Sequence, residues 1–353
     1  MGPEKKEGAG TLNGLETSSP LRGFLGVLLL NALLAFPILY QSYKHYDPEL
    51  TPWDVNAYMT LVEHPGEFEP PFRFRFLAPL AVRAMRILPG YDVAVDFTED
   101  PRVKKDYFHF SLFNFAVTVL TSGLLFVHLR ARLRPAYAYL GSVLYLFSFY
   151  SVVTNIIPMG DTVCQLAIIA CILLYERDKP VWFALACLIG VFAKETLIIV
   201  LGIWILIQSL TDRRRLWYLL YALPAALAYF AATRLSPSET EFNYYRPGFV
   251  LDRVFRVFMP STWDASLFFH VFVAQAPLLL ALTAYAWLKG FHKREGLSMN
   301  PELLIFPLLI WLGITLDLGN STGRVAFMGF PALIYFEAMV VQAWVSGTRA
   351  GHR

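Results

Sequence analysis

The sequence predicts an all-α polytopic membrane protein with about ten transmembrane helices. Two properties of the composition lead to this: 56% of the 353 residues are hydrophobic, and only 16% are charged. Soluble domains carry about 25% charged residues, so lipid must face much of this chain. The 16% aromatic content excludes an intrinsically disordered chain, and three cysteines exclude a disulfide scaffold. The net charge of +3 is small and scattered, so no nucleic-acid partner is expected.

Apolar runs long enough to cross, or nearly cross, a bilayer recur along the chain. The first apolar run begins just after Arg22. We interpret it as a retained anchor, because no small-x-small cleavage site lies between this run and the Gln-Ser-Tyr-Lys stretch that follows it. The ten predicted spans are 24–40, 107–129, 135–154, 161–175, 180–193, 196–210, 216–234, 265–288, 302–317 and 325–345. The fifth and sixth are short and separated only by Lys194-Glu195, so one broken helix is the alternative to two spans.

Basic residues set the predicted orientation through the positive-inside rule. With the N-terminus in the cytoplasm, the short outer connections, 155–160 and 318–324, contain only Arg324. The inner connections contain Arg130, Arg132, Arg134, Arg177, Lys179, Arg213, Arg214, Arg215, Lys289, Lys293 and Arg294. Both termini are therefore predicted to be cytoplasmic.

The predicted organisation is one membrane domain between two tails. Residues 1–22 are expected to form a disordered cytoplasmic tail, 23–345 a single transmembrane domain and 346–353 a second cytoplasmic tail. Two outer segments are long: a first extracytoplasmic loop at 41–106 and a second segment at 235–264. In the first loop, Trp53 to His64 and Phe76 to Leu88 have the pattern of amphipathic helices lying in the headgroup plane. The apolar face expected for the second helix consists of Leu77, Leu80, Ala81, Ala84 and Leu88, beside Arg83 and Arg86.

Ionisable residues in or beside spans are costly to bury, so their positions mark candidate sites. Most of them are predicted at the outer rim, and Glu337, in the middle of the last span, is the main exception. The rim residues are Asp54, Asp161, Lys194, Glu195, Arg246, Arg253, Arg256, His270, Asp317 and Arg324. Carboxylates and cations that lie at one depth of the membrane are the groups needed to bind a phosphate-bearing lipid headgroup together with a polar acceptor.

Structural roles are the competing interpretation of several of these residues. Asp317 and Arg324 bracket a six-residue turn, where an ion pair would stabilise its ends. Asp161 follows Pro158-Met159-Gly160 as an N-cap would. The structural alternative for Lys194 and Glu195 is that their long side chains extend to the membrane interface and keep their charged ends in water.

Asp54 lies on a predicted helix just after the first anchor. Asp54 and Tyr58 share one face of that helix at the i, i+4 spacing. The loop continues through a stretch rich in proline and phenylalanine that contains Arg73 and Arg75. A helix-cap role is the structural alternative for Asp54.

This layout resembles the GT-C superfamily of integral-membrane glycosyltransferases. The resemblance lies in a cytoplasmic N-terminus, one anchor, and a large first outer loop with two interfacial helices and an early Asp followed by Tyr. The short motifs that contribute are Phe74-Arg75-Phe76-Leu77-Ala78-Pro79, Gly160-Asp161, Ala193-Lys194-Glu195-Thr196, Gly323-Arg324 and Phe330-Pro331.

The resemblance implies an enzyme that moves a sugar from a polyprenyl-phosphate donor, with inversion, to a glycan, lipid or protein acceptor. It implies a site on the extracytoplasmic face of a prokaryotic plasma (inner) membrane, with Asp54 as the base and Asp161 as its polar partner. The groups expected to bind substrate and phosphate are Lys194, Glu195, Arg246, Arg324, Arg73, Arg75 and Tyr58. Many members carry a paired acidic motif with a divalent metal, whereas Asp54 stands alone, so binding of Mg2+ or Mn2+ by Asp54 and Asp161 is left open.

The alternative function is a transporter or flippase for a lipid-linked or anionic substrate. That class predicts ionisable residues at the bilayer midplane and discontinuous helices there. The predicted clustering at one rim favours the transferase instead. A non-catalytic assembly subunit is a third interpretation, which would leave the rim residues without a pocket.

Overall fold

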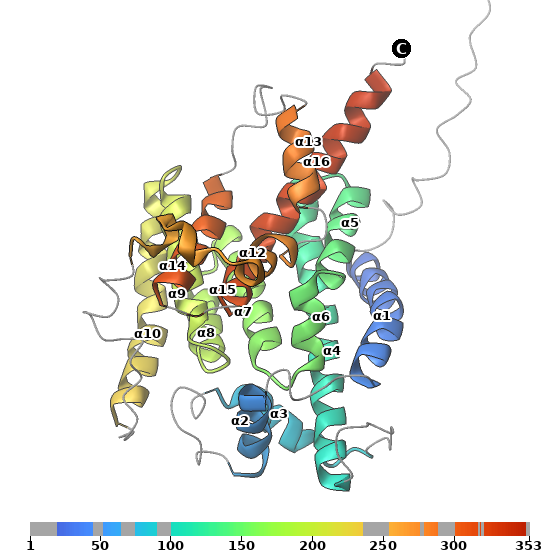
Figure 1. The fold of residues 1–353 in the computed structure, drawn as a ribbon, viewed down its shortest axis with the longest axis vertical. Helices are drawn as coiled ribbons and strands as arrows, with labels where there is room; N and C mark the ends of the chain where they lie inside the picture. The colour runs from blue at the N-terminus through green and yellow to red at the C-terminus, as the bar shows by residue number, and fades with distance from the viewer. Residues whose placement is uncertain are drawn as a thin grey trace, which may run out of the picture.

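The computed structural model describes residues 20–44, 52–64, 75–89, 100–235, 254–275, 279–288, 301–316, 318 and 321–350. Every regular element within these ranges is helical (Figure 1). The α-helices are α1 (Pro20–Lys44), α2 (Pro52–Glu63), α3 (Leu77–Met85), α4 (Pro101–Arg130), α5 (Pro135–Leu146), α6 (Phe149–Ile156), α7 (Asp161–Glu176), α8 (Pro180–Gly190), α9 (Thr196–Ser209), α10 (Tyr218–Leu235), α12 (Ala265–Phe268), α13 (Leu279–Leu288), α14 (Ile305–Thr315), α15 (Ser321–Phe327) and α16 (Phe330–Ala350). The predicted N-terminal tail and most of the second outer segment lie outside the described residues.

Several helices have the length and composition needed to cross a membrane. Three do so alone: α1, α4 and the segment Arg213–Thr233, most of which is α10. Two bent pairs, α5 with α6 and α15 with α16, raise the number to five if each pair is one span. Helices α8 and α9 and the segment Pro301–Thr315 are apolar but shorter. The described chain is therefore an all-α protein with three to five candidate spans, compared with ten predicted.

Helix α4 begins earlier than the sequence pattern predicts. Asp100 is its N-cap and accepts a hydrogen bond from the Arg102 backbone N–H at 2.8 Å, and Pro101 occupies the first helical position. These two local signals start the helix inside the polar stretch 41–106. Its 30 residues correspond to a length of about 45 Å, so its first turns extend beyond the other helices to reach α2 and α3 (Figure 1).

Two segments predicted as single spans, 135–154 and 325–345, are broken in the structure. Helices α5 and α6 meet at 51°, where the Ser148 hydroxyl accepts a hydrogen bond from the Ser151 backbone N–H and caps a new helix. Helices α15 and α16 meet at 69°, and Pro331 lies in the first turn of α16. A third interruption is the π-helical turn at Phe269–Val273, within the span predicted at 265–288.

Polar contacts at the helix ends define the relative directions of α7, α8 and α9. Asp161, the first residue of α7, forms an ion pair with the turn that precedes α9. At the opposite end, Arg132 binds both Glu176, the last residue of α7, and Glu302, which accepts a hydrogen bond from Gln208 near the end of α9. Helices α7 and α9 therefore run parallel, and α8 returns between them as a separate helix.

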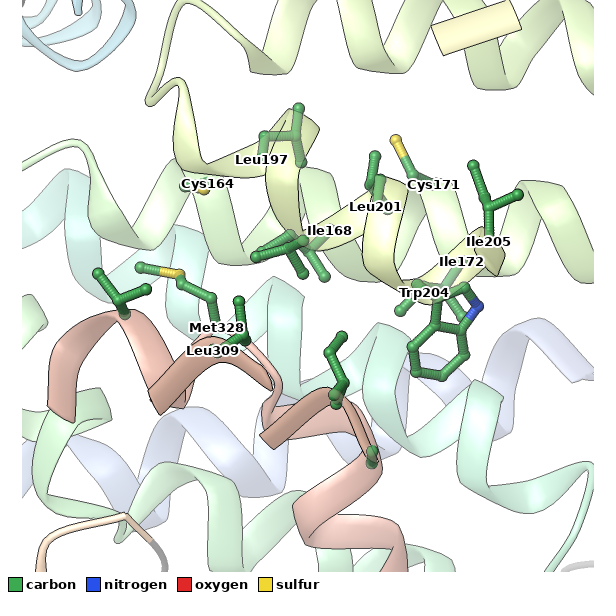
Figure 2. Close-up of a cluster of buried hydrophobic side chains, with 14 of the residues drawn as sticks. Cys164, Ile168, Cys171, Ile172, Leu197, Leu201, Trp204, Ile205, Leu309 and Met328 are labelled. Carbon is green, nitrogen blue, oxygen red and sulfur yellow. The ribbon is translucent and has the colours of Figure 1, made fainter. Parts of the chain in front are cut away.

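Four apolar clusters join the described helices, and the smallest packs α13 against α16. The largest packs α7, α8, α9, α10, α14 and α15 together (Figure 2). It includes the three fully buried cysteines, Cys164, Cys171 and Cys187, which are unbridged. A second joins α1, α4, α5 and α16. The third contains Tyr58 and Phe110, and it fixes α2 and α3 against α4 and the residues before α7. This third cluster positions the candidate site.

The apolar face predicted for α3 is not the face that packs on the protein. Ala78, Pro79 and Val82 are buried, whereas Leu80 and Leu88 are 43% and 45% exposed. Small residues permit close approach to α4, and the larger leucines point away from the bundle.

Arg86, which the sequence pattern assigns to lipid headgroups, forms ion pairs within the protein. Its Nε donates to Asp106 Oδ1 at 2.8 Å, and its Nη2 contacts the second carboxylate oxygen. The carboxylate of Glu63 lies 3.6 Å from the same Nη2. Arg86 therefore fastens α3 to both α4 and α2, while Arg83 is exposed.

Candidate functional site

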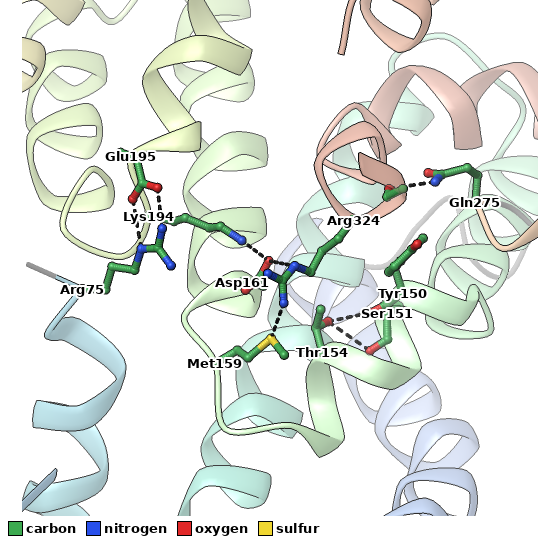
Figure 3. Close-up of polar contacts among 11 residues, drawn as sticks. Arg75, Tyr150, Ser151, Thr154, Met159, Asp161, Lys194, Glu195, Gln275 and Arg324 are labelled. Carbon is green, nitrogen blue, oxygen red and sulfur yellow. Dashed lines mark hydrogen bonds and ion pairs between the residues drawn. The ribbon is translucent and has the colours of Figure 1, made fainter. Parts of the chain in front are cut away.

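Charged side chains from four segments meet where α7 and α9 begin (Figure 3). This Asp161 cluster consists of Asp161, Lys194, Arg324, Arg75 and Glu195. Lys194 Nζ donates to Asp161 Oδ1 at 2.6 Å, and these two side chains are only 5% and 3% exposed. Arg324 Nε approaches the same oxygen from the other side, at 3.8 Å. Two cations thus converge on one carboxylate oxygen.

Arg324 makes a second contact, to a weak acceptor. Its Nη1 donates to Met159 Sδ at 3.1 Å, and a thioether sulfur accepts hydrogen bonds poorly. Asp317, the ion-pair partner considered from the sequence, lies outside the described residues. The guanidinium of Arg324 is therefore turned toward the connection between α6 and α7.

Arg75 and Glu195 form the second ion pair of the cluster. Arg75 Nε donates to Glu195 Oε2 at 3.0 Å, and Nη2 contacts Oε1, so the pair is bidentate. Burial raises the pKa of Glu195, but the adjacent Arg75 guanidinium outweighs that effect and holds it below its ordinary value. The pair joins the segment before α3 to the turn before α9. Two side chains that were predicted to bind substrate therefore bind each other in the structure.

Close packing at Gly160 brings α2 to the cluster. A Cβ added to Gly160 would lie 2.6 Å from the Ala193 carbonyl oxygen and 3.1 Å from Tyr58 Oη, so only glycine fits without a shift. Tyr58 is buried on α2. Asp54 lies one helical turn earlier on α2, and its side chain lies outside the described residues.

The structural alternatives for Asp161 and Lys194 can be compared with this geometry. The N-cap of α7 is Gly160, and Asp161 is the first residue of the helix, so the N-cap assignment is wrong. Lys194 is buried rather than extended to an interface. Arg73 and Arg246, two of the predicted phosphate-binding residues, lie outside the described residues.

The described residues at the cluster do not fit a divalent metal. Lys194 and Arg324 both approach Asp161 Oδ1, and two adjacent positive charges oppose the binding of a divalent cation at that oxygen. Within the described ranges, no group of three or more His, Cys, Asp or Glu side chains has the geometry to hold a metal ion. No step in the chemistry below uses a metal.

A polar contact beside the cluster was not predicted. Tyr150 Oη lies 3.0 Å from His270 Nδ1, and Gln275 Nε2 donates to the Gly323 carbonyl oxygen at 2.7 Å. Gly323 directly precedes Arg324, and an added Cβ there would lie 2.2 Å from Tyr150 Oη. His270 therefore has a partner in Tyr150, which carried no sequence signal.

The opposite end of the bundle contains a second charged cluster, also not predicted as such. This Arg132 cluster consists of Arg132, Glu176, Glu302, His128 and Gln208. Arg132 Nη1 donates to both oxygens of Glu302, at 2.9 and 2.7 Å, and Nη2 donates to Glu176 at 2.7 Å. His128 Nδ1 lies 3.1 Å from Glu176, and Gln208 donates to Glu302 at 2.7 Å. In the sequence, Arg132 served only as a marker of topology.

Comparisons of the chain with protein-family models, with curated proteins and with solved structures give no match. The function is therefore inferred from the chemistry of the Asp161 cluster and from the layout of the chain.

Proposed function

We propose that this chain is a GT-C-type membrane glycosyltransferase that moves a sugar from a polyprenyl-phosphate donor to an extracytoplasmic acceptor, with inversion. In this proposal the chain spans a plasma membrane ten times, with both termini in the cytoplasm. Helices α2 and α3 lie on the extracytoplasmic side with the Asp161 cluster, and the Arg132 cluster lies on the cytoplasmic side.

The distribution of basic residues supports this orientation. Arg132 binds Glu176, and Arg215 lies over the ring of Tyr175 at 4.7 Å, so these basic connections share one end of the bundle. Tyr218, at the start of α10, donates to Asp178 at the same end. An excess of Lys and Arg on one side is typical of cytoplasmic connections.

The observation that carries the proposal is the contact of α2 with the Asp161 cluster. Tyr58 on α2 packs against Gly160, the residue before Asp161, and Lys194 and Arg324 converge on that aspartate. In this proposal Asp54, which lies on the same helix, acts beside these two cations. A base next to cations is the arrangement that displacement of a lipid phosphate requires.

The proposed reaction is a single displacement at the anomeric carbon. The Asp54 carboxylate accepts the proton of the acceptor hydroxyl as its oxygen forms a bond to that carbon. The bond from carbon to the phosphate oxygen breaks, and the electron pair leaves on the lipid phosphate. Lys194 and Arg324 stabilise the charge on the leaving phosphate, and Asp161 positions both cations before the donor binds. In the proposal, Arg246 and Arg73 add to this positive field, and the Arg75–Glu195 pair holds the turn before α9 in place.

The test is sugar transfer in membrane vesicles with a panel of radiolabelled polyprenyl-phosphate sugars. We expect Asp54→Asn to lower the transfer rate by about 10²-fold or more, the usual contribution of a general base, with unchanged amounts of protein in the membrane. The matched control is Asp100→Asn, which alters an aspartate on the same polar stretch that caps α4. It should keep transfer near the wild-type rate for each folded molecule. Wild-type transfer by Asp54→Asn would contradict the proposal.

One observation favours the alternative of a flippase. The helix breaks between α5 and α6 and between α15 and α16, with bends of 51° and 69°, are discontinuities of the kind found in transporters. The ion pairs described above lie at the two ends of the bundle rather than in its middle, which favours the transferase. Protein-dependent movement of labelled carrier across the vesicle membrane, without transfer from any donor, would establish the flippase instead.

A further inference from the structure

The Asp161 cluster has a geometry that phosphate binding would change. Lys194 and Arg324 both approach Asp161 Oδ1, at 2.6 and 3.8 Å. A phosphate oxygen bound by the same two cations would need nearly the same position as this carboxylate oxygen. The carboxylate and the phosphate are therefore competitors for Lys194.

Lys194 is the cation for which this competition is strongest. Its Nζ is a compact charge at the end of a buried side chain, and a buried ammonium is costly without an anion beside it. In the structure, Asp161 is that anion. If a phosphate replaced this carboxylate, the ammonium would keep an anionic partner.

Arg324 has a donor directed at a weak acceptor. Its Nη1 contacts Met159 Sδ at 3.1 Å, and hydrogen bonds to a charged oxygen are about twice as strong as neutral ones. A phosphate oxygen replacing the sulfur would strengthen this contact. The guanidinium fork has enough donors to keep Asp161 while it binds phosphate.

The Asp161 carboxylate has a second source of stabilisation after a phosphate has displaced it from Lys194. It is the first residue of α7, where the unpaired backbone N–H groups of the first turn favour a negative charge. A carboxylate at that position remains compensated after the exchange.

We propose that Asp161 substitutes for the substrate phosphate when no ligand is bound, and that a phosphate-bearing ligand displaces it from Lys194. This inference rests on the proposed function, because it concerns the same two cations. Asp161 is then a positioning residue that sets the affinity for phosphate: it keeps the buried cations paired, and it opposes the binding of any anion too weak to displace it.

The experiment measures equilibrium binding of a radiolabelled short-chain prenyl phosphate to detergent-purified protein. Removing the competing charge with Asp161→Asn should lower the Kd for the prenyl phosphate about tenfold, while lowering the stability of the ligand-free protein. Inorganic phosphate as a competitor separates the two sources of the anion. Competition at similar concentrations identifies a site for free phosphate, and competition only in large excess identifies a lipid phosphate.

A matched control is Glu302→Gln, which removes a buried carboxylate from Arg132 at the other end of the bundle. It should destabilise the protein to a similar extent and leave the Kd unchanged. If Asp161→Asn does not fold, Lys194→Arg is the second variant. Its guanidinium can hold carboxylate and phosphate together, so we expect a Kd at least about threefold below wild type.

Unchanged or weaker binding in Asp161→Asn, or in Lys194→Arg when only that variant folds, would overturn the inference, as would absence of binding to the wild type. The failure of the proposed function is separate, because it is measured as transfer by Asp54→Asn. Tighter phosphate binding by Asp161→Asn together with wild-type transfer by Asp54→Asn would retain the exchange at Lys194 and reject Asp54 as the base.

Discussion

The Asp161 cluster and the Arg132 cluster are built from the same kinds of side chain with opposite proportions. In the Asp161 cluster, two cations share one carboxylate oxygen, and one guanidinium N–H is directed at a sulfur atom. In the Arg132 cluster, one guanidinium is shared by two carboxylates, Glu176 and Glu302. Two cations that converge on one carboxylate favour the binding of an external anion, whereas two carboxylates that converge on one arginine do not.

The difference extends to what each cluster connects. Arg132 ties the end of α4 to the end of α7 and to the residues before α14, and Gln208 adds the end of α9. The Asp161 cluster instead joins the starts of α7 and α9 to α15 and to the segment before α3. We infer that the Arg132 cluster is a structural clamp and that the Asp161 cluster is adapted for ligand exchange.

The largest expected effect tests the clamp. Arg132→Ala leaves the side chains of Glu176 and Glu302 without their shared cation, and Glu302 is only 5% exposed. We expect the free energy of unfolding to fall by about 3 kcal/mol, the lower end for a broken buried pair, since Arg132 is 27% exposed. Unfolding in mixed micelles measures it. A loss below about 0.5 kcal/mol, typical of surface positions, would show that the contacts of Arg132 do not stabilise the fold.

A smaller effect is expected at the Asp161 end. Gly160→Ala places a methyl group 2.6 Å from a backbone carbonyl oxygen, that of Ala193, which cannot rotate away. We expect a loss of about 2 kcal/mol in unfolding free energy, as for an overpacked site, together with weaker prenyl phosphate binding because Asp161 is the next residue.

The control for that variant is Gly202→Ala, on α9. An added Cβ at Gly202 meets nothing within 4 Å, and alanine is favoured over glycine inside a helix by about 0.5–1 kcal/mol. Gly202→Ala should therefore raise stability slightly and leave binding unchanged. Equal behaviour of the two variants would contradict the close contact of Gly160 with the Ala193 carbonyl oxygen.

The sequence was sufficient for the positions of many helices, because those depend on local signals. Apolar runs predicted α4, α7, α8 and α9, and prolines or caps set several of their starts. The breaks at Ser148 and near Gly329 were missed, because an uninterrupted apolar run looks the same whether its helix is straight or bent. Whether each helix crosses a membrane depends on its surroundings as well as its length, which is why the ten predicted spans remain a proposal.

The residues of the candidate site were also predicted from the sequence, whereas the contacts between them were not. Asp161, Lys194, Glu195 and Arg324 were selected from the sequence because charges beside apolar runs are costly. Arg75 was selected only through the resemblance to GT-C enzymes. Which of these residues bind each other was not predicted, since pairing depends on how distant helices pack. The Arg132 cluster was missed for the same reason: its arginine looked like a topology marker, and its carboxylates come from positions 44 and 170 residues away.

The smallest expected effect separates the contributions within the clamp. Gln208 and Arg132 both donate to Oε1 of Glu302, at 2.7 and 2.9 Å. Gln208→Ala removes one of these donors and should lower the unfolding free energy by about 1 kcal/mol. Ser209→Ala is the matched control, because the Ser209 hydroxyl donates only to the carbonyl of Leu206 on its own helix.

Combining Gln208→Ala with Arg132→Ala shows whether the two donors act on Glu302 as a unit. Because they share one acceptor oxygen, the double variant should differ from the sum of the single variants by at least about 0.5 kcal/mol. Strict additivity would mean that Gln208 stabilises α9 independently, and that the clamp consists of Arg132 and its two carboxylates alone. A coupling of the expected size would place α9 within the clamp, so that the helix whose first residues adjoin Lys194 is anchored at its far end.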